Sequence, residues 1–259
     1  MKAEERQRLG LAASAFFAAA ATALFLQGKK RSAHRFGAIS AGVFLAPTLI
    51  RNCAWWGPVT KRFPASGREV WLTIDDGPDP DETPRVLDVL RSFGARATFF
   101  CIGQRVNERP DLARAAKDAG HKVENHTYSH PAFSFWAAPP RWAAGEIRRG
   151  SQAIREATGE DPTLFRAPAG LSNAFVHRQA QREKLRMVGW SASGHDGIAH
   201  NPHRTVQGIL AAAVPGSIIL MHENRLPGMR PGQRSETLGG VLAGLERLRL
   251  RPIIPDLES

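Results

Sequence analysis

Seven side chains combine the residue types that hydrolytic chemistry needs, and most of them follow a short apolar run. They are Asp75, Asp76, His126, His130, Arg166, Asp196 and His222. Two imidazoles and a carboxylate are a common ligand set for a catalytic divalent metal that keeps a position open for water. The two histidines at 126 and 130, beside the aspartate pair, therefore predict a metal site. Two surface histidines in a turn are the alternative interpretation.

The elements that must position these residues form a regular alternation from residue 70 onward. We expect strands over residues 70–74, 97–102, 122–125, 163–166, 186–190 and 217–221. We expect helices over residues 83–92, 110–119, 141–158, 173–184, 204–214 and 238–248. Strands that alternate with helices pair in parallel through crossovers, so the pattern predicts an α/β fold, a distorted (β/α) barrel of about seven units.

The carboxyl ends of the expected strands carry most of the polar residues described above. In a βα barrel these ends meet at one face, where active sites lie. The usual preference of turns for certain polar residues does not explain why acids, imidazoles and an arginine stand at five such ends. We therefore expect these side chains to converge on one site.

Four segments resemble the motifs of the polysaccharide deacetylase family, which shares the NodB-homology domain and includes chitooligosaccharide and peptidoglycan deacetylases. Residues 72–78 (Leu-Thr-Ile-Asp-Asp-Gly-Pro) resemble the opening motif, and residues 126–130 (His-Thr-Tyr-Ser-His) resemble the HxxSH metal motif. Residues 166–170 (Arg-Ala-Pro-Ala-Gly) resemble the Arg-x-Pro segment. Residues 218–222 (Ile-Ile-Leu-Met-His) are similar to the closing strand and its histidine. The motifs follow the order of the family.

The resemblance implies a metal centre with a general base beside it. Asp76, His126 and His130 would bind a divalent metal, usually zinc. Asp75 would be the base that deprotonates the metal-bound water, and Arg166 would orient it. Amide hydrolysis requires a Lewis acid, an activated water and a separate proton donor, so this set fits the reaction. A guanidinium beside the base would keep its carboxylate ionised.

The resemblance also implies a general acid and a substrate contact. His222 would protonate the departing amine, and Asp196 would tune His222, because a nearby carboxylate keeps an imidazole protonated. Pro168 and Ala169 would contact the substrate, and a backbone N–H there could stabilise an oxyanion.

The chain departs from the family pattern near the expected acid. The family often has tyrosine at the position of Ala169. Its fourth motif often reads Asp-x-x-Asp-Trp, where this chain has Ser193, Asp196 and Gly197. Glu223 stands where aspartate is common. Of the three residues that define this motif, the chain keeps only Asp196, and the expected role of Asp196 depends on that single match.

Residues 1–62 lie outside the resemblance. Residues 9–27 contain no charge, a basic Lys-Lys-Arg loop follows at residues 29–31, and residues 36–50 form a second uncharged run. About 20 apolar residues cross a hydrocarbon core. The two runs predict a membrane helical hairpin, with the second extended to Trp56 at the interface. Two buried helices of a soluble protein are the alternative.

The positive-inside rule places the basic loop in the cytoplasm. Both ends of the hairpin then lie outside, so the deacetylase domain, residues 63–259, would face the periplasm or the exterior while anchored to the inner membrane. A cleaved signal peptide fits less well, because the first apolar run leads into Lys-Lys-Arg rather than a small-residue cleavage site.

Charge and cysteine content exclude two other classes of protein. Of the net charge of +11, residues 1–62 carry +8 (ten Lys/Arg, two acids), and the remaining 197 residues carry +3 (25 and 22). A nucleic-acid binder would carry its charge on the folded domain, so we expect no nucleic-acid partner. Cys53 and Cys101 are too few for a disulfide framework. We expect a free thiol at the first and a core residue at the second.

The expected function is a metal-dependent hydrolase that removes N-acetyl groups from amino sugars of an envelope polysaccharide. One alternative keeps the chemistry but acts as a deacylase or deformylase on a lipid-linked sugar at the membrane surface. Another is a carbohydrate-binding relative without catalysis, which the departures at Ala169, Ser193 and Gly197 suggest.

The sequence leaves the roles of two further groups of residues undecided. Four aromatic residues could line a sugar groove or pack a long loop: Phe133, Phe135, Trp136 and Trp142. Three histidines could supply an alternative metal ligand: His195, His200 and His203.

Overall fold

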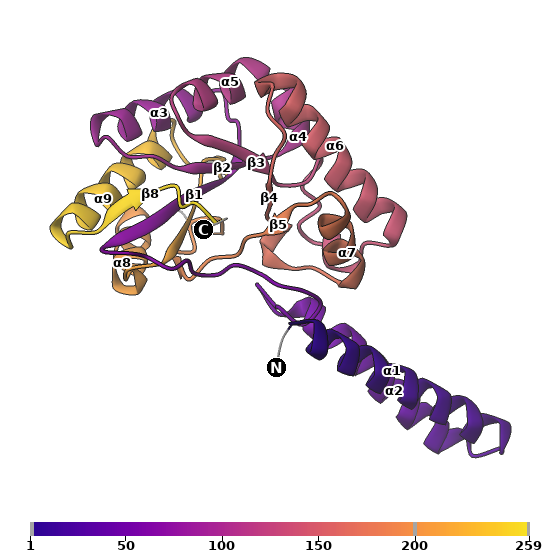
Figure 1. Ribbon diagram of the computed structural model, residues 1–259. Coiled ribbons are helices and arrows are strands. Elements are labelled where there is room, and N and C mark those ends of the chain that lie inside the picture. Colours follow the sequence, from indigo (N-terminus) through magenta and orange to yellow (C-terminus); the bar gives the residue numbers. More distant parts are fainter. Residues whose placement is uncertain (1–2, 199–200, 258–259) are drawn as a thin grey trace.

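Figure 1 shows the computed structural model, which describes residues 3–198 and 201–257. The strands are β1 (Glu69–Gly77), β2 (Thr98–Cys101), β3 (Lys122–Asn125), β4 (Leu164–Phe165), β5 (Arg186–Met187), β6 (Ala192–Ser193), β7 (Ile218–His222) and β8 (Arg251–Ile253). They form one eight-stranded sheet in the order β5-β4-β3-β2-β1-β7-β6, with β8 beside β1. Every ladder between them is parallel, as the alternating pattern predicts.

Within the described ranges, seven helices surround this sheet and two more form a separate pair (Figure 1). The surrounding helices are α3 (Thr83–Ser92), α4 (Gly103–Glu108), α5 (Pro110–Asp118), α6 (Pro140–Thr158), α7 (Ala174–Arg182), α8 (Pro202–Ala212) and α9 (Gln233–Arg247). The pair is α1 (Ala3–Leu26) and α2 (Lys30–Leu45). Short 3-10 turns are η1 (Ala46–Leu49), η2 (Phe135–Ala137) and η3 (Pro168–Gly170).

The central strand β1 shows how the sequence sorts its side chains. Leu72 packs into the main core cluster with residues of α3 and α9. Trp71 packs with Phe100 in a different cluster on the inner face of the sheet. Because side chains alternate along a strand, Thr73 and Asp75 share the inner face with Trp71. The aromatic side chain of Trp71 and the expected base Asp75 therefore lie on the same face of the sheet.

The prediction of a closed barrel is wrong, because the sheet stays open on one side. β5 and β6 end the sheet, and no ladder joins them among the described residues. Thr60 instead bridges Val188, and Arg62 bridges Ser217, so the linker before the domain runs along the open side. β4, β5 and β6 are two residues long each, too short to continue the hydrogen-bond ladder around a full barrel. The fold is a curled parallel half-barrel.

The predicted elements are otherwise close to the observed ones. The strand over 122–125 and the helix over 83–92 have the predicted bounds. The helix predicted over 141–158 ends as expected at Gly159, which has φ of 77°. The prediction missed α4, β6 and β8, and it began the last helix five residues after the observed start of α9.

The first two helices form the predicted hairpin, which projects away from the body (Figure 1). The Ser14 and Ser40 hydroxyls donate to each other's backbone carbonyls, at 3.1 and 2.8 Å. The rings of Phe17 and Phe36 lie 5.9 Å apart. These contacts hold the two helices antiparallel along their length.

The membrane part of the hairpin prediction is not supported. Among the residues that the structure describes, we find no helix that is both long and apolar enough to cross a membrane. The expected extension of the second run to Trp56 is also wrong, because α2 ends at Leu45 and Pro47 lies in the following 3-10 turn. Proline lacks the N–H that would continue a helix. Trp56 is 1% exposed and lies within the body.

Candidate active site

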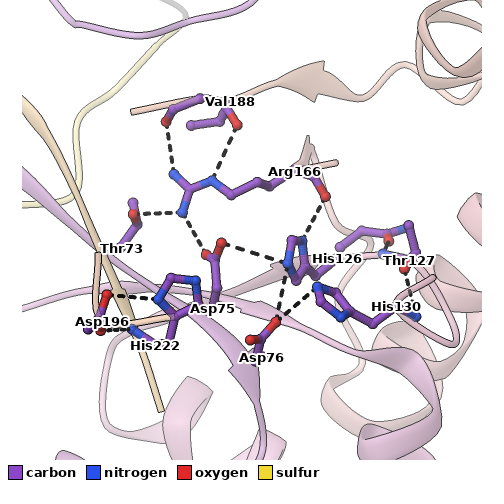
Figure 2. A network of polar contacts seen from close by, with 12 residues as sticks. Thr73, Asp75, Asp76, His126, Thr127, His130, Arg166, Val188, Asp196 and His222 are labelled. Carbon is purple, nitrogen blue, oxygen red and sulfur yellow. Dashed lines mark hydrogen bonds and ion pairs between the residues drawn. The ribbon is translucent and has the colours of Figure 1, made fainter. Parts of the chain in front are cut away.

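The predicted site residues converge on a cavity of about 740 Å³ at the carboxyl ends of the strands. Of the seven side chains that opened the sequence analysis, five line it: Asp75, Asp76, His126, His130 and His222. Figure 2 shows that they come from three parts of the chain, namely the end of β1, the loop after β3 and the end of β7. The convergence expected from the sequence is therefore confirmed.

A bulge in β1 brings two adjacent aspartates to the same cavity. Asp75 pairs with Phe100 and Gly77 pairs with Cys101, so Asp76 is left out of the register. Asp76 has φ of 71°, in the left-handed region. Consecutive strand side chains normally point to opposite faces, but a bulge re-aims one of them. Both carboxylates therefore reach the cavity.

Asp76, His126 and His130 form a cluster that fits a divalent cation. One ligand atom from each residue lies within 4.8 Å of the other two. Asp76 Oδ1 lies 3.4 Å from His126 Nε2 and 3.2 Å from His130 Nε2 (Figure 2). This oxygen is buried and receives no hydrogen bond within the described chain. A carboxylate with two imidazoles is a usual donor set for zinc and related metals, and it leaves coordination positions open.

Surrounding groups hold the His126 ring and the loop that carries His130. His126 Nδ1 donates to the Arg166 carbonyl oxygen at 2.7 Å. A carbonyl oxygen only accepts, so Nδ1 carries the proton and Nε2 keeps its lone pair for a metal. The loop before His130 is held by Glu146 of α6, which accepts from the Ser129 backbone N–H at 2.8 Å and from its hydroxyl at 2.9 Å. The sequence analysis did not identify Glu146.

The charges of the cluster suit metal binding. Burial raises the pKa of Asp76, but contact with His126 and the charges of His130 and His222 outweigh it and hold that pKa well below its usual range. Burial, together with the neighbouring His126, lowers the pKa of His130 to about 4. At neutral pH the carboxylate is ionised and the His130 imidazole is neutral, which are the ligand forms of both groups.

Asp75 and Arg166 form a buried ion pair that we call the base arm. Arg166 Nη1 donates to Asp75 Oδ1 at 2.6 Å and to Thr73 Oγ1 at 2.8 Å. Nε and Nη2 donate to the carbonyls of Val188 and Gly189. All three guanidinium nitrogens are thus bonded. The second oxygen, Asp75 Oδ2, faces the metal cluster, 3.7 Å from His126 Nε2.

His222, Asp196 and Arg234 form what we call the acid arm. His222 Nδ1 donates to Asp196 Oδ1 at 2.9 Å, and the His222 backbone N–H donates to Oδ2 at 2.7 Å (Figure 2). Burial lowers the pKa of His222, but Asp196, with smaller contributions from Asp76 and Asp75, raises it to about 9. The structure therefore places Asp196 where the resemblance predicts it.

Arg234 of α9 is the member of the acid arm that sequence reasoning missed. It is 3% exposed. Nη1 donates to the Asp196 backbone carbonyl at 2.8 Å and lies 3.5 Å from Asp196 Oδ2. Nε donates to the Asn224 carbonyl at 2.8 Å. One guanidinium therefore ties the loop of Asp196 to the segment that follows His222.

Two residues of the departing motifs fit their surroundings closely. A Cβ at Gly197 would lie 2.8 Å from His222 Cε1 and 2.9 Å from Nε2. A larger residue at this position, such as the tryptophan common in the family, would need a different backbone or a different place for His222. A Cβ at Gly77 would overlap Glu223 Oε1, which is buried against this turn. Burial raises the pKa of Glu223 to about 8, and Thr83 Oγ1 donates to its carboxyl group at 2.9 Å.

The four aromatic residues left open by the sequence divide into two pairs. Phe133 and Trp136 line the cavity, and Phe133 is 97% exposed. Phe135 is fully buried and Trp142 packs against its cluster. One pair is therefore available to a ligand and the other pair stabilises the loop.

The predicted substrate contacts and the further histidines differ in whether they reach the cavity. Ala169 lines the cavity with φ of 53°, whereas Pro168 is buried and is not among the residues that line the cavity. The contact of either with substrate stays a prediction. His195 lines the cavity outside the metal cluster, and His203 is exposed on α8. His200 lies outside the described residues. Cys101 is a core residue, as predicted.

Comparisons with known proteins agree with the motifs. Residues 63–188 match the family described as polysaccharide deacetylase. A chitooligosaccharide deacetylase of Bradyrhizobium sp. (strain ANU 289) is 40% identical over 162 residues, which cover 62% of this chain and 73% of that protein. A peptidoglycan-N-acetylglucosamine deacetylase of Bacillus cereus is 33% identical over 195 residues, covering 74% and 87%.

A solved structure extends the likeness to the fold. The family 4 carbohydrate esterase from Streptomyces lividans, in complex with acetate, has a TM-score of 0.66 at 32% identity, covering 76% of this chain and 96% of that one. The predicted motifs meet at one cavity, and the relatives described above point to the same family as the motifs. The chain belongs to the polysaccharide deacetylase family of hydrolases.

Proposed function

We propose that this protein removes N-acetyl groups from amino sugars of an envelope polysaccharide by metal-dependent hydrolysis. One observation carries the proposal: the three proposed metal ligands share a single cavity with a carboxylate held by arginine and an imidazole held by carboxylate. Zinc is the proposed metal because the donor set has two imidazoles and one carboxylate. When bound, it supplies Lewis acidity toward the acetyl carbonyl and the attacking water.

Asp75 is placed to act as the general base. Its Oδ1 is engaged by Arg166, which leaves Oδ2 facing the ligand cluster. That oxygen takes a proton from water as the water oxygen attacks the acetyl carbon. The buried guanidinium keeps the carboxylate oriented.

His222 is placed to act as the general acid. Its Nδ1 is occupied by Asp196, so Nε2 is the nitrogen available to the cavity. As the carbon–nitrogen bond breaks, Nε2 gives its proton to the departing amine, and acetate and the free amino sugar are the products. An imidazole with pKa near 9 is protonated at neutral pH, as this role requires.

The substrate class is proposed from the relatives and the cavity wall. The two relatives described above are a chitooligosaccharide deacetylase and a peptidoglycan-N-acetylglucosamine deacetylase. Phe133 and Trp136 offer aromatic faces along the cavity, which suit the apolar faces of sugar rings. Both support an acetylated amino-sugar polymer.

A lipid-linked sugar is the second candidate, with deacylation or deformylation as the reaction. The observation that favours it is the position of the hairpin, since η1 packs against η2 and Arg51 lines the cavity. We also propose that the hairpin associates with the inner membrane and that the domain faces the periplasm or exterior. Fractionation of cells, with protease added to intact spheroplasts, tests that location.

Acetate release tests the proposed function. Full-length protein is assayed on a panel of acetylated glycans and lipid-linked sugars, with chelator and after zinc is restored. We expect turnover that the chelator abolishes and zinc recovers. Brisk turnover of soluble oligosaccharides would count against a lipid-linked substrate. Glycan binding without acetate release, with metal present, would favour the inactive carbohydrate-binding relative.

Metal analysis tests the ligand assignment. Asp76→Ala, His126→Ala and His130→Ala are each expected to lose both metal and activity. His203→Ala is the matched control, because His203 is exposed on α8, away from the cavity lining. Stoichiometric zinc retained by His130→Ala would contradict the assignment.

A further inference from the structure

The segment that follows the hairpin forms part of the wall of the active-site cavity. η1 packs against η2, the turn that carries Trp136. Arg51, two residues after η1, lines the same cavity as the metal cluster. The amino-terminal region is therefore more than a tether, because it supplies a side chain to the site.

The backbone next to Arg51 is tightly fixed. The Asn52 backbone N–H donates to the Gly170 carbonyl at 2.8 Å, and Nδ2 donates to the Trp190 carbonyl at 3.4 Å. A Cβ at Gly170 would lie 3.0 Å from Asn52 Oδ1, and a Cβ at Gly189 would lie 2.6 Å from it. Asn52 thus fits against two glycines of the domain, and this contact sets where Arg51 enters the cavity.

The guanidinium of Arg51 is available to a ligand. Arg51 is exposed, and no carboxylate among the described residues forms an ion pair with it. The two acids that line the cavity are already committed, Asp75 to Arg166 and Asp76 to the ligand cluster. Ala169, also in the lining, has no side chain beyond Cβ.

We propose that Arg51 is a specificity determinant that binds an anionic group on the substrate, a phosphate or a carboxylate near the acetylated sugar. A guanidinium recognises either group through paired, charge-assisted hydrogen bonds. The inference depends on the proposed deacetylase function and narrows it, because it predicts that neutral oligosaccharides are the poorer substrates.

Matched substrates test the proposal. Metal-loaded, full-length protein is given a neutral N-acetylated chitooligosaccharide, the same oligosaccharide with a terminal phosphate, and a glycan fragment with lactyl carboxylates. The readout is kcat/KM for acetate release from each. We expect the wild-type protein to prefer at least one anionic substrate over the neutral one by about tenfold or more, and the preferred arm identifies phosphate or carboxylate as the source of the charge.

Variants at Arg51 assign that preference to one side chain. Arg51→Gln is expected to bring the anionic-to-neutral ratio close to one, Arg51→Glu to invert it, and Arg51→Lys to keep part of it. Arg178→Gln is the control: it removes one exposed arginine from α7, outside the cavity lining, and is expected to keep the wild-type ratio. Melting temperatures of all variants verify that they are folded.

The outcomes separate this proposal from the function on which it rests. Turnover of all substrates without an anionic preference in the wild-type protein would overturn the role of Arg51 and leave the deacetylase function standing. A preference that survives in Arg51→Gln would do the same. No acetate from any substrate, with metal bound, would overturn both.

Discussion

The base arm and the acid arm of the site use the same pair of charges for opposite purposes. In the base arm the carboxylate reacts, and Arg166 contacts Asp75 directly at 2.6 Å. In the acid arm the carboxylate lies between the arginine and the reacting group, with Asp196 3.5 Å from Arg234 and 2.9 Å from His222. Arginine thus orients the reacting carboxylate in the base arm, whereas in the acid arm the carboxylate favours the charged form of the His222 imidazole.

The arms also differ in how completely their arginines are bonded. Arg166 donates from all three guanidinium nitrogens and its guanidinium lies 4.2 Å from the centre of the Phe100 ring. Arg234 Nη2 is buried and has no hydrogen-bond partner among the described groups. The base arm is therefore the more rigid, and the acid arm is expected to tolerate more change.

Removing the base should have the largest effect. Asp75→Asn keeps the shape of the side chain but cannot take a proton at neutral pH, so kcat is expected to fall on the order of 10³-fold. Acetate release under saturating substrate measures it. The metal content should stay at the wild-type level, because Asp75 lies outside the ligand cluster.

Asp76→Asn is the matched control for Asp75→Asn. It makes the same chemical change one residue further along β1, at a predicted metal ligand, and it should lose metal together with activity. Loss of metal from Asp75→Asn instead would make Asp75 a ligand and end the distinction between base and cluster.

Removing each arginine compares the rigidity of the two arms. Arg166→Gln leaves the buried Asp75 carboxylate without its partner, and we expect it to lower the free energy of unfolding by about 3–5 kcal/mol. Arg234→Gln should cost less, about 1–2 kcal/mol, because Asp196 keeps two hydrogen bonds from His222. Urea denaturation of the two variants gives both values. Equal losses would show that the bonding difference between the arms has no energetic counterpart.

Changing the carboxylate of the acid arm should alter the pH dependence. The pKa of His222 is raised to about 9 by Asp196 against the opposing effect of burial. In Asp196→Asn the burial effect remains and the charge is gone, so that pKa falls. The general acid must be protonated, so activity is lost as pH rises through its pKa, and the alkaline limb moves to lower pH. A bound cation acts on both proteins, so the difference between their profiles is the quantity to measure.

Loss of the Asp196 carboxylate should also lower the rate at neutral pH. At neutral pH we expect kcat of Asp196→Asn to fall about 100-fold, within the usual range for loss of acid–base assistance. Asp161→Asn, an exposed acid that pairs with Arg155, should leave the profile unchanged. An alkaline limb in the same place in Asp196→Asn would show that His222 does not set it.

The sequence predicts most of the base arm and only part of the acid arm, for a structural reason. Asp75 lies near the end of the buried strand β1 and His222 ends the apolar strand β7, so the pattern that identifies each strand also identifies the residue. Arg234 lies on α9, whose predicted start at residue 238 excluded it. Arg234, Leu238 and Val241 share the buried face of α9 at helical spacing. A helix predicted to start at residue 233 would therefore have placed Arg234 on the buried face and marked it as a candidate.

Other features depend on long-range geometry that no local pattern contains. β5 and β6 are two residues long each and, in the described part of the chain, end the sheet without pairing, whereas the sequence shows only that strands and helices alternate. The entry of Arg51 into the cavity depends on Asn52 fitting against Gly170 and Gly189, more than 100 residues away along the chain. Such contacts appear only when the segments are brought together.

Gly197 gives the smallest expected effect and the sharpest test of the acid arm. A Cβ there would lie 2.9 Å from His222 Nε2, the nitrogen proposed to donate the proton. Gly197→Ala should therefore displace the ring, weaken the bond from Nδ1 to Asp196 and lower kcat about tenfold, with KM and melting temperature nearly unchanged. Gly145→Ala is the control, since a Cβ there meets nothing within 4 Å. An unchanged kcat in Gly197→Ala would mean that the acid arm absorbs the shift, and that His222 is held less firmly than its two bonds to Asp196 imply.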